Sequence, residues 1–410
     1  MLPALDLDFV RAQFPALSSD WVFFDNAGGS QTLRTVAERI SDYLLTSNVQ
    51  LGASYAVSKL SGERVRDAHV SIAELIGATR PDEVVMGPSA TALTYTLAAA
   101  LAEDIAPGDE IIVTDTDHEA NIGPWLKLEQ QKGAVIKVWA VRPDTLELEL
   151  ADLDALMTPR TKLVCFTHAS NILGTINPVA NITRFVHERG ARVVVDGVAL
   201  APHRAVDVAA WDVDFYIYSF YKVYGPHHAV LYGKYDQLLA LPSLNHFFIG
   251  REVVPYKLQQ GNVNYELSVG CTAITDYLVE LGGRTGSLTD RRGQIRAAFD
   301  AIAQQEEQLA ERLLSFLRSR NSVRIIGNQA ADRGRRVPTI SFIAENHRSD
   351  EVVPRVDEHR IGIRYGDFYA RRLIEKLGLT PKAGVIRVSM VHYNTVAEVD
   401  RLVEALDSIL

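Results

Sequence analysis

The chain has 410 residues, of which 47% are hydrophobic and 23% charged, and its formal net charge is -9 at pH 7. This is the composition of an ordinary globular protein, and the length predicts one large and one smaller domain. The negative charge argues against a nucleic-acid or anionic-membrane surface, because both would require clustered Lys and Arg. Only two cysteines occur, Cys165 and Cys271, so neither a disulfide framework nor a Cys-rich zinc site is expected.

The first residues, "MLPALDLDFVRAQF", include acidic side chains and lack the basic and apolar regions of a signal peptide. No apolar run in the chain is long enough to span a bilayer. We therefore expect a cytoplasmic protein that binds neither membrane nor nucleic acid.

From about residue 60 to 235, helical and strand patterns alternate. Helices are expected at residues 61–78, 90–102 and 181–190, where apolar side chains recur at helical spacing. Short apolar strands are expected at residues 83–87, 109–115, 134–140, 161–168, 192–197 and 214–219. Buried strands that alternate with helices indicate a mainly parallel sheet covered on both faces, and thus an α/β fold.

Beyond residue 285 the pattern changes to that of a smaller α+β domain. A long amphipathic helix is expected at residues 296–320, followed by strands at 323–327, 337–344, 360–366 and 385–393 and a terminal helix at 395–410. We expect a large domain at 20–270, a smaller one formed by 1–19 with 285–410, and a connecting region at 271–284. Cys271 is expected near the start of a helix.

Polar residues follow five of the predicted strands. In open α/β sheets, ligands bind beyond the carboxyl ends of the strands. The five strands lead into "GPSATA", "TDHEAN", "THASN", "GVALAPH" and "FYKVYGP". Five such transitions along one sheet edge predict a polar site there.

The segment "GPSATALTY" places small residues just before a predicted helix. Free N–H groups at Ser89, Ala90 and Thr91, together with the helix dipole, would favour an anion such as a phosphate. An ordinary Ser N-cap explains the same residues. The segment is not a Walker loop, because the Gly-Lys-Ser/Thr ending is missing.

Asp196 ends an apolar strand, and Lys222 follows the next strand in an equally apolar setting. The carboxylate needs a partner, which is a helix N-terminus, an Arg or a protonated pyridine nitrogen. A partly desolvated lysine has a lowered pKa and can form a Schiff base, although a surface lysine that snorkels is the plainer alternative. Pyridoxal phosphate is one ligand that accounts for the anion loop, Asp196 and Lys222 together.

The chain resembles class V aminotransferases, specifically the cysteine desulfurase and selenocysteine lyase branch. The resemblance rests on "FFDNAGGSQ", "DHEANIGPW", "THASNILGTINP", "VVVDG", "DFYIYSFYKVYGP", "QQGNVNYE" and "RVSMVHYNT", which run from about residue 20 to 400. It implies the pyridoxal-phosphate-dependent transferase fold (fold type I) and a homodimer with the active site near the subunit interface.

The resemblance also implies roles for particular residues. Lys222 matches the lysine that holds the cofactor, Asp196 the partner of the pyridinium nitrogen, and His118 the residue stacked on the cofactor ring. The other cofactor-binding positions implied are Asn171 near the ring hydroxyl, Ala199, the phosphate-binding Ser89, Ala90 and Ser219, and Asn262 reaching from a neighbouring subunit. Substrate-binding positions are Arg387, whose fork suits a carboxylate, and Arg364, Tyr221 and Tyr369. Each has a plainer structural alternative, such as a salt bridge for Arg387.

The chain departs from this branch at three positions. The desulfurase pattern Arg-x-Gly-x-x-Cys-Ala is "RYGDFYA" here, with Tyr369 in place of the catalytic cysteine. Tyr221 replaces the histidine usual before the lysine, and Ala199 replaces a glutamine. Cys165 lies in an apolar run, where an inert thiol is expected. A persulfide mechanism therefore lacks its nucleophile.

We expect a pyridoxal-phosphate enzyme that takes a small amino acid through an external aldimine. A cysteine-desulfurase-like C–S lyase that works by β-elimination without a persulfide cysteine ranks first, and an aminotransferase or amino-acid epimerase follows. A catalytically silent cofactor-binding protein is a further alternative. So is a metal hydrolase that would use Asp117, His118, His203, His227 and His228, although no HExxH-like pair occurs.

Overall fold

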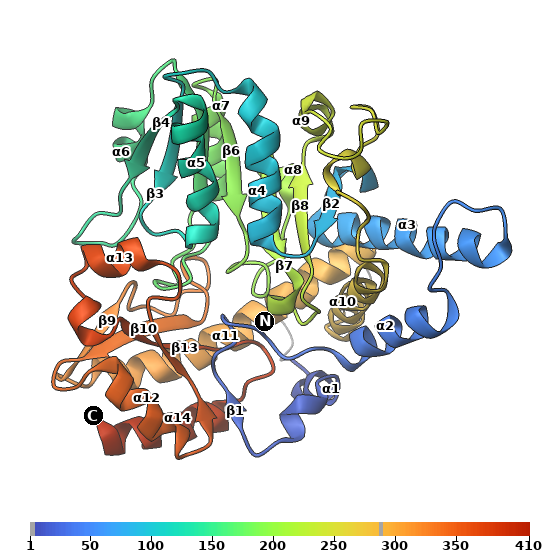
Figure 1. Cartoon of the computed structure of the whole chain (residues 1–410). Helices are drawn as coiled ribbons and strands as arrows, with labels where there is room; N and C mark the ends of the chain where they lie inside the picture. Colours follow the sequence, from blue (N-terminus) through green and yellow to red (C-terminus); the bar gives the residue numbers. More distant parts are fainter. Residues whose placement is uncertain (1–4, 287–289) are drawn as a thin grey trace.

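The computed structural model describes residues 5–286 and 290–410. Figure 1 shows an α/β protein in which a large sheet with its helices lies above a smaller sheet formed by the C-terminal part of the chain. A third, two-stranded sheet joins β1 (Val22–Phe23) near the N-terminus to β11 (Ile361–Gly362).

The large sheet has seven strands in the order β2-β8-β7-β6-β5-β3-β4. Five of them, from β7 to β4 in that order, are parallel, while β8 runs antiparallel to both β7 and β2. The mainly parallel sheet expected from the sequence is confirmed, and the predicted strands omitted only β8. The strands are β2 (Val84–Gly87), β3 (Glu110–Thr114), β4 (Val135–Trp139), β5 (Thr161–Thr167), β6 (Arg192–Asp196), β7 (Phe215–Ser219) and β8 (Ala229–Gly233).

Because β8 is antiparallel to both of its neighbours, β2 and β7 run in the same direction. The carboxyl ends of β2, β3, β5, β6 and β7 therefore meet at one edge of the sheet. These are the five strands that lead into polar segments in the sequence, so the fold brings those segments together.

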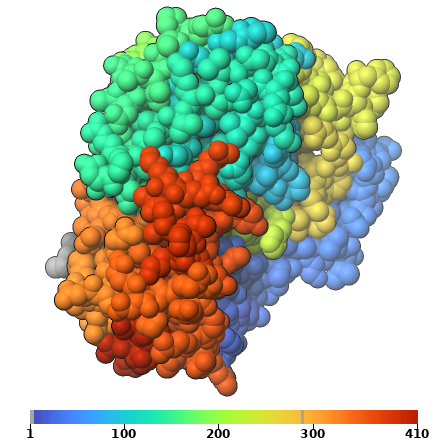
Figure 2. Space-filling model, turned by 60° about the vertical axis from the view of Figure 1, so that its left-hand side comes forward, coloured from blue at the N-terminus to red at the C-terminus, as the bar shows by residue number. Residues whose placement is uncertain are grey.

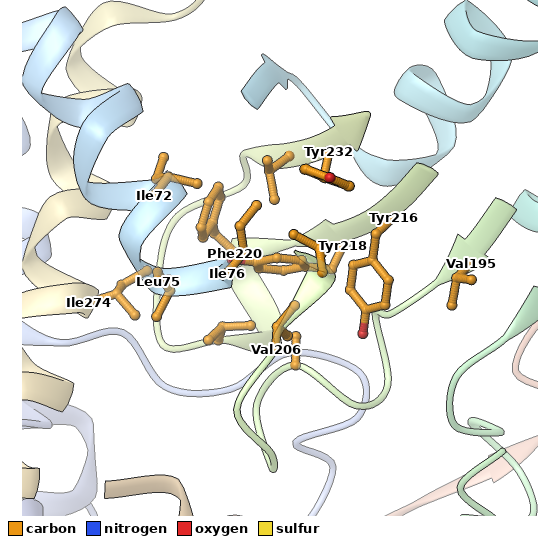
Figure 3. Close-up of a cluster of buried hydrophobic side chains, with 14 of the residues drawn as sticks. Ile72, Leu75, Ile76, Val195, Val206, Tyr216, Tyr218, Phe220, Tyr232 and Ile274 are labelled. Carbon is orange, nitrogen blue, oxygen red and sulfur yellow. The ribbon is translucent and has the colours of Figure 1, made fainter. Parts of the chain in front are cut away.

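Alternate side chains of each central strand enter different hydrophobic cores. In β6, Val193 and Val195 belong to one core and Val194 to the other, as the two-residue period of a strand requires. Figure 3 shows part of the first core, in which Ile72, Leu75 and Ile76 of one helix pack toward aromatic side chains of the sheet. A sheet buried on both faces leaves its edges as the place for a site.

Helices of the large sheet contribute to these two cores. α3 (Ala56–Ile76), α7 (Val179–His187), α8 (Val208–Trp211) and α10 (Tyr265–Arg284) contribute to the first, and α4 (Ala90–Leu101), α5 (Gly123–Lys132) and α9 (Tyr235–Ala240) to the second. α1 (Leu7–Ala12), α2 (Arg34–Thr46) and α6 (Leu150–Leu156) also contribute to the first core, with one buried side chain each: Val10, Val36 and Leu153.

The smaller sheet is antiparallel, with the order β12-β13-β10-β9. Its strands are β9 (Val323–Ile326), β10 (Thr339–Ala344), β12 (Arg364–Gly366) and β13 (Val385–Ser389), and its helices are α11 (Arg291–Arg318), α12 (Ser349–Asp357), α13 (Arg371–Lys376) and α14 (Val396–Ile409). The single strand expected at 360–366 is divided between β11 and β12. In Figure 2 the C-terminal residues, orange to red, lie directly against residues from the middle of the chain, coloured green to cyan.

α10 is one continuous helix that includes residues 271–284. It begins at Asn264, whose side chain accepts a hydrogen bond from the Leu267 N–H. Cys271 is fully buried inside this helix, so the expectation that it lies near a helix start is wrong. Within residues 5–286 and 290–410, none of the helices combines the length and the apolar character needed to cross a bilayer.

Candidate active site

A pocket opens at the carboxyl edge of the large sheet. It brings together most of the residues that the sequence singled out. Its walls include Ser89, Ala90, Thr91, His118, Asn171, Asp196, Ala199, Ser219, Tyr221 and Lys222.

Lys222 lies in a short 3₁₀ turn directly after β7 and is 8% exposed. Its ammonium group forms no hydrogen bond or ion pair with any residue in the described part of the chain. Burial, with a further contribution from the positive charge of Arg387, lowers the pKa of Lys222 to about 8. Its lowered pKa makes a larger share of the amine neutral, and hence nucleophilic, near physiological pH than for an ordinary lysine.

Asp196 is the last residue of β6, and it too is 8% exposed. One carboxylate oxygen, Oδ1, accepts a hydrogen bond from the Val198 N–H at 2.8 Å, while Oδ2 has no partner among the described residues. Burial raises the pKa of Asp196. An unpaired carboxylate oxygen at the wall of a pocket calls for a protonated ligand atom.

Asp117 lies behind the pocket wall and is fully enclosed. It accepts hydrogen bonds from Thr114 Oγ1 and from Asn121 Nδ2, the latter at 2.9 Å. Burial, with a smaller contribution from the nearby charge of Asp196, raises the pKa of Asp117 to about 7. Asp117 therefore supports the site from outside and does not line it.

The N-terminus of α4 forms one end of the pocket. Ser89 caps the helix by accepting the Ala92 N–H at 3.1 Å, and the Ala90 N–H donates to Ser219 Oγ at 3.1 Å. The first N–H groups of a helix have no intrahelical acceptor, and the helix dipole favours negative charge there. The predicted N-cap is therefore present, while the anion site at the same helix end stays a prediction.

His118 is held as a neutral imidazole. Its Nδ1 accepts the Ala120 N–H at 3.0 Å, which places any ring proton on Nε2. Burial, followed by the charge of Lys222, lowers the pKa of His118 to about 4. On its outer side the ring of Tyr369 lies at 5.1 Å. The flat, uncharged ring is suited to stacking on an aromatic ligand.

Asn171, Ala199 and Tyr221 complete the pocket walls. Asn171 Nδ2 donates to the carbonyl of Phe368 at 2.9 Å, which ties the pocket to the loop after β12. The Tyr221 ring stacks on His227 at 5.0 Å, and burial raises the pKa of its phenol. Ala199 has a small side chain and leaves space in the pocket.

Four predicted site residues do not line the pocket: Arg387, Arg364, Tyr369 and Asn262. Arg387 is only 2% exposed, because Phe368 stacks on its guanidinium at 3.7 Å and Asp25 Oδ1 accepts from its Nη2 at 2.9 Å. Arg364 and Tyr369 are mostly exposed, and Asn262 lies at a neighbouring hollow. The resemblance implies that Arg387 binds the substrate carboxylate, and this role stays a prediction, because the side chain lies beside the pocket rather than in its wall.

A segment near the N-terminus, which we term the N-terminal strap (residues 25–33), connects the smaller sheet to the lysine turn. At one end the Ala27 N–H donates to Ser389 Oγ at 2.8 Å. At the other, the Ser30 N–H donates to the Tyr221 carbonyl at 3.1 Å and the Leu33 N–H to the Tyr224 carbonyl at 3.0 Å. The strap thus borders Lys222.

The residues of the metal-hydrolase alternative are dispersed. His203 Nδ1 pairs with Glu306 at 2.8 Å, and His228 Nε2 hydrogen-bonds Ser268 at 3.1 Å. No group of three or more His, Cys, Asp or Glu side chains in the described residues has the geometry to hold a metal ion. The arrangement therefore does not favour that alternative.

Neither cysteine is suited to act as a sulfur-accepting nucleophile. Cys165 and Cys271 are fully buried, and burial raises the pKa of each thiol well above its ordinary value. A thiolate nucleophile requires a lowered pKa and access. Neither cysteine meets those requirements.

Asp25 and Phe368 are site residues that sequence reasoning missed. Both lie inside motifs already quoted, "FFDNAGGSQ" and "RYGDFYA", so the signal was their position in a matched segment. Thr94, Thr167 and Ala169 also line the pocket and were not singled out.

Known proteins match nearly the whole chain. A sequence profile of the family described as "Aminotransferase class-V" matches residues 22–402. The aminotransferase-like protein FGM3 of Gibberella zeae is 44% identical, with 99% of each chain covered. The cysteine desulfurase-like protein ustD of Aspergillus flavus is 34% identical, with 99% of this chain and 91% of that protein covered.

The fold is also that of a solved desulfurase. The crystal structure of the cysteine desulfurase CsdA from Escherichia coli superimposes with a TM-score of 0.84 at 28% identity, covering 99% of this chain and 98% of that one. Family profile, relatives and structure agree over almost the full length. The chain therefore belongs to the class-V aminotransferase family, whose members are enzymes that depend on pyridoxal phosphate.

Proposed function

We propose that the protein binds pyridoxal phosphate on Lys222 and cleaves the C–S bond of a small α-amino acid by β-elimination, without an enzyme persulfide. The observation that carries the proposal is the pairing, in one pocket, of an unpartnered lysine whose pKa is lowered to about 8 with the half-paired carboxylate of Asp196.

The residues present fit this cofactor. The aldehyde of the cofactor would bond to the amine of Lys222, and its protonated ring nitrogen would donate a hydrogen bond to Asp196 Oδ2. The ring would stack on neutral His118. The phosphate would lie at the N-terminus of α4, beside Ser219. Four separate features of one pocket thus match four separate parts of one molecule.

The cofactor, when bound, withdraws electrons from the α-carbon of an attached amino acid. Asp196 would hold a proton on the ring nitrogen, because its buried carboxylate needs a cationic partner. The ε-amine of Lys222 would accept the α-proton of the substrate, since its pKa of about 8 suits a general base near neutral pH.

Sulfur would leave this site as free sulfide. Tyr369 stands where desulfurases carry their nucleophile, and a phenol does not accept sulfur as a thiolate does. Cys165 and Cys271 are fully buried with raised pKa values, so neither replaces it. The expected products from L-cysteine are sulfide, pyruvate and ammonia.

A borohydride experiment tests the cofactor assignment. Reduction of the cofactor-loaded protein followed by peptide mapping should place a pyridoxyl group on Lys222. Lys257, which is also buried with its pKa lowered to about 8 but donates to two backbone carbonyls, is the matched internal control. A label on Lys257 or elsewhere would contradict the assignment.

A second experiment tests the sulfur chemistry. Sulfide and pyruvate should form from L-cysteine in equal amounts, and Cys165→Ser with Cys271→Ser should leave the rate unchanged. Loss of sulfide release in a folded double variant would indicate a persulfide and would contradict the proposal.

Transamination is the second candidate function. It is favoured by the phenol of Tyr369 in the nucleophile position, because amino-group transfer needs no sulfur acceptor, and by the printed description of FGM3 as aminotransferase-like. An aminotransferase would convert bound cofactor to its amine form and release a 2-oxo acid that keeps the side chain. A 2-oxo acid product that keeps the β-substituent of the substrate would therefore indicate transamination.

We also propose that the enzyme is a homodimer in which Asn262 contributes to the partner's site. This rests on family resemblance together with the position of Asn262, which is exposed and does not line the pocket of its own chain. Sedimentation equilibrium measures the association. A monomer that is fully active would contradict it.

A further inference from the structure

Two arginines face each other on neighbouring strands beside the pocket. Arg364 of β12 is directly opposite Arg387 of β13 in the antiparallel register. Directly opposite side chains lie on the same face of the sheet, and like charges in this position destabilise it. Burial makes the conflict worse, since Arg387 is 2% exposed. The pair requires a compensating negative charge.

Asp25 supplies that charge from the N-terminal strap. Its Oδ1 accepts a hydrogen bond from Arg387 Nη2 at 2.9 Å, while its Oδ2 lies 3.7 Å from Arg364 Nη1. Each carboxylate oxygen therefore serves one arginine.

The backbone fixes the carboxylate in this place. The Asn26 N–H donates to the Ser389 carbonyl at 3.3 Å, which locks the strap to the end of β13. Gly28 leaves the space that the carboxylate occupies, because a Cβ at Gly28 would lie 2.8 Å from Asp25 Oδ2. The position of Asp25 is thus set by its neighbours on both sides.

The guanidinium of Arg387 is held by several contacts, but one of its N–H donors has no acceptor. Asp25 holds Nη2, the Asn171 carbonyl accepts from Nη1 at 3.3 Å, and the Phe368 ring covers one face. Its Nε is buried and has no hydrogen-bond partner in the described part of the chain. A buried donor without a partner is costly, and an incoming carboxylate oxygen would relieve that cost.

We infer that Asp25 is a positioning residue: it holds Arg387 and Arg364 in the orientation that receives the carboxylate of the substrate. The inference rests on the proposed function only in that the substrate is an α-amino acid. Asp25 does not touch the substrate. It acts by preventing the two guanidinium groups from separating and by keeping the Nε side of Arg387 free.

Two probes that differ only in a carboxylate test this role. L-Alanine and ethylamine are titrated into the cofactor-loaded protein, and the half-saturating concentration is read from the visible spectrum, without turnover. In Asp25→Asn the value for L-alanine should rise about tenfold, because a displaced binding group loses most of its contribution. The value for ethylamine should change less than about twofold, since it has no group for Arg387.

A second variant moves the carboxylate without removing its charge. Gly28→Ala forces Asp25 Oδ2 away from its place and should weaken L-alanine binding in the same direction while sparing ethylamine. Asp20→Asn is the matched control, because Asp20 pairs with Arg360 at the surface of the same N-terminal region and should leave both values unchanged.

Three results would overturn the inference. Equal weakening of both probes in Asp25→Asn would indicate a merely structural residue. Tighter L-alanine binding would show that Asp25 competes with the substrate for Arg387. A wild-type protein that binds ethylamine as tightly as L-alanine, or neither of them, would show that no carboxylate is received here.

The proposed function and the positioning role of Asp25 can be contradicted separately. If L-cysteine yields no sulfide while L-alanine binding still depends on Asp25, the C–S lyase assignment is wrong and the positioning role stands. If sulfide forms but L-alanine binding ignores Asp25→Asn, the positioning role is wrong and the lyase assignment stands.

Discussion

Gly197 lies directly against the ring of Tyr216: a Cβ at Gly197 would come within 2.1 Å of Tyr216 Cε1. Gly197 follows Asp196, and Tyr216 is a fully buried residue of β7 labelled in Figure 3. The neighbouring ring therefore requires a glycine immediately after the carboxylate of the site.

Gly197→Ala should reduce the free energy of unfolding by more than about 2 kcal/mol, because overpacking a buried site forces the ring or the strand to move. Cofactor affinity should fall as well, since Asp196 moves with its neighbour. Gly62→Ala is the control: Gly62 lies in α3 with no atom within 4 Å of an added Cβ, so this change should stabilise the helix slightly. Urea unfolding measures the free energy of unfolding of both variants. An unchanged midpoint for Gly197→Ala would contradict the packing argument.

Cofactor uptake should increase with pH through the pKa of Lys222. That pKa is lowered to about 8, and only the neutral amine attacks an aldehyde. Below pH 8 the second-order rate of pyridoxal phosphate uptake by the cofactor-free protein should rise about tenfold per pH unit, and above it the rate should level off.

Arg387→Gln tests the cause of that pKa. The charge of Arg387 is the second contribution that lowers the pKa of Lys222, after burial. Its removal should raise the pKa and move the midpoint of the uptake profile to higher pH. A shift to lower pH would show that Arg387 acts on Lys222 in some other way.

Ser219→Ala should weaken binding of pyridoxal phosphate about tenfold, because it removes the hydroxyl that holds the Ala90 N–H beside the expected phosphate. Pyridoxal, which has no phosphate, should bind the variant and the wild type alike. Equilibrium dialysis with both compounds makes the comparison. Equal losses for the two would place the phosphate elsewhere.

His118→Phe should retain the cofactor better than His118→Ala does. The imidazole is neutral over the physiological range, since burial lowers the pKa of His118 to about 4, so its role is that of a flat ring. The dissociation rate of the cofactor should rise about tenfold in His118→Ala and change little in His118→Phe. Comparable losses in both would indicate that a ring nitrogen is essential.

The position of Asp196 and Lys222 in one pocket could be predicted from the sequence, because strand ends are local features. Asp196 and Lys222 each follow an apolar run, and parallel strands necessarily bring such ends together. The order β2-β8-β7 was not predictable in the same way, because β8 follows β7 through the loop at 220–228 rather than through a crossover helix.

The burial of Arg387 could not be predicted from the sequence. A motif fixes the identity of Arg387 but not its burial, which depends on Phe368 and Asp25, two residues that come from opposite ends of the chain. Likewise, the expected helix start at Cys271 was wrong because the cap at Asn264 lies several residues earlier than the apolar pattern indicated.

The N-terminal strap has a mechanical consequence. Its backbone is fastened to Ser389 of the small sheet at one end and to the carbonyls of Tyr221 and Tyr224 at the other. Any rocking of the small sheet would therefore pull on the turn that carries Lys222. Lys222 is thus connected through backbone hydrogen bonds to a sheet that lies outside the pocket.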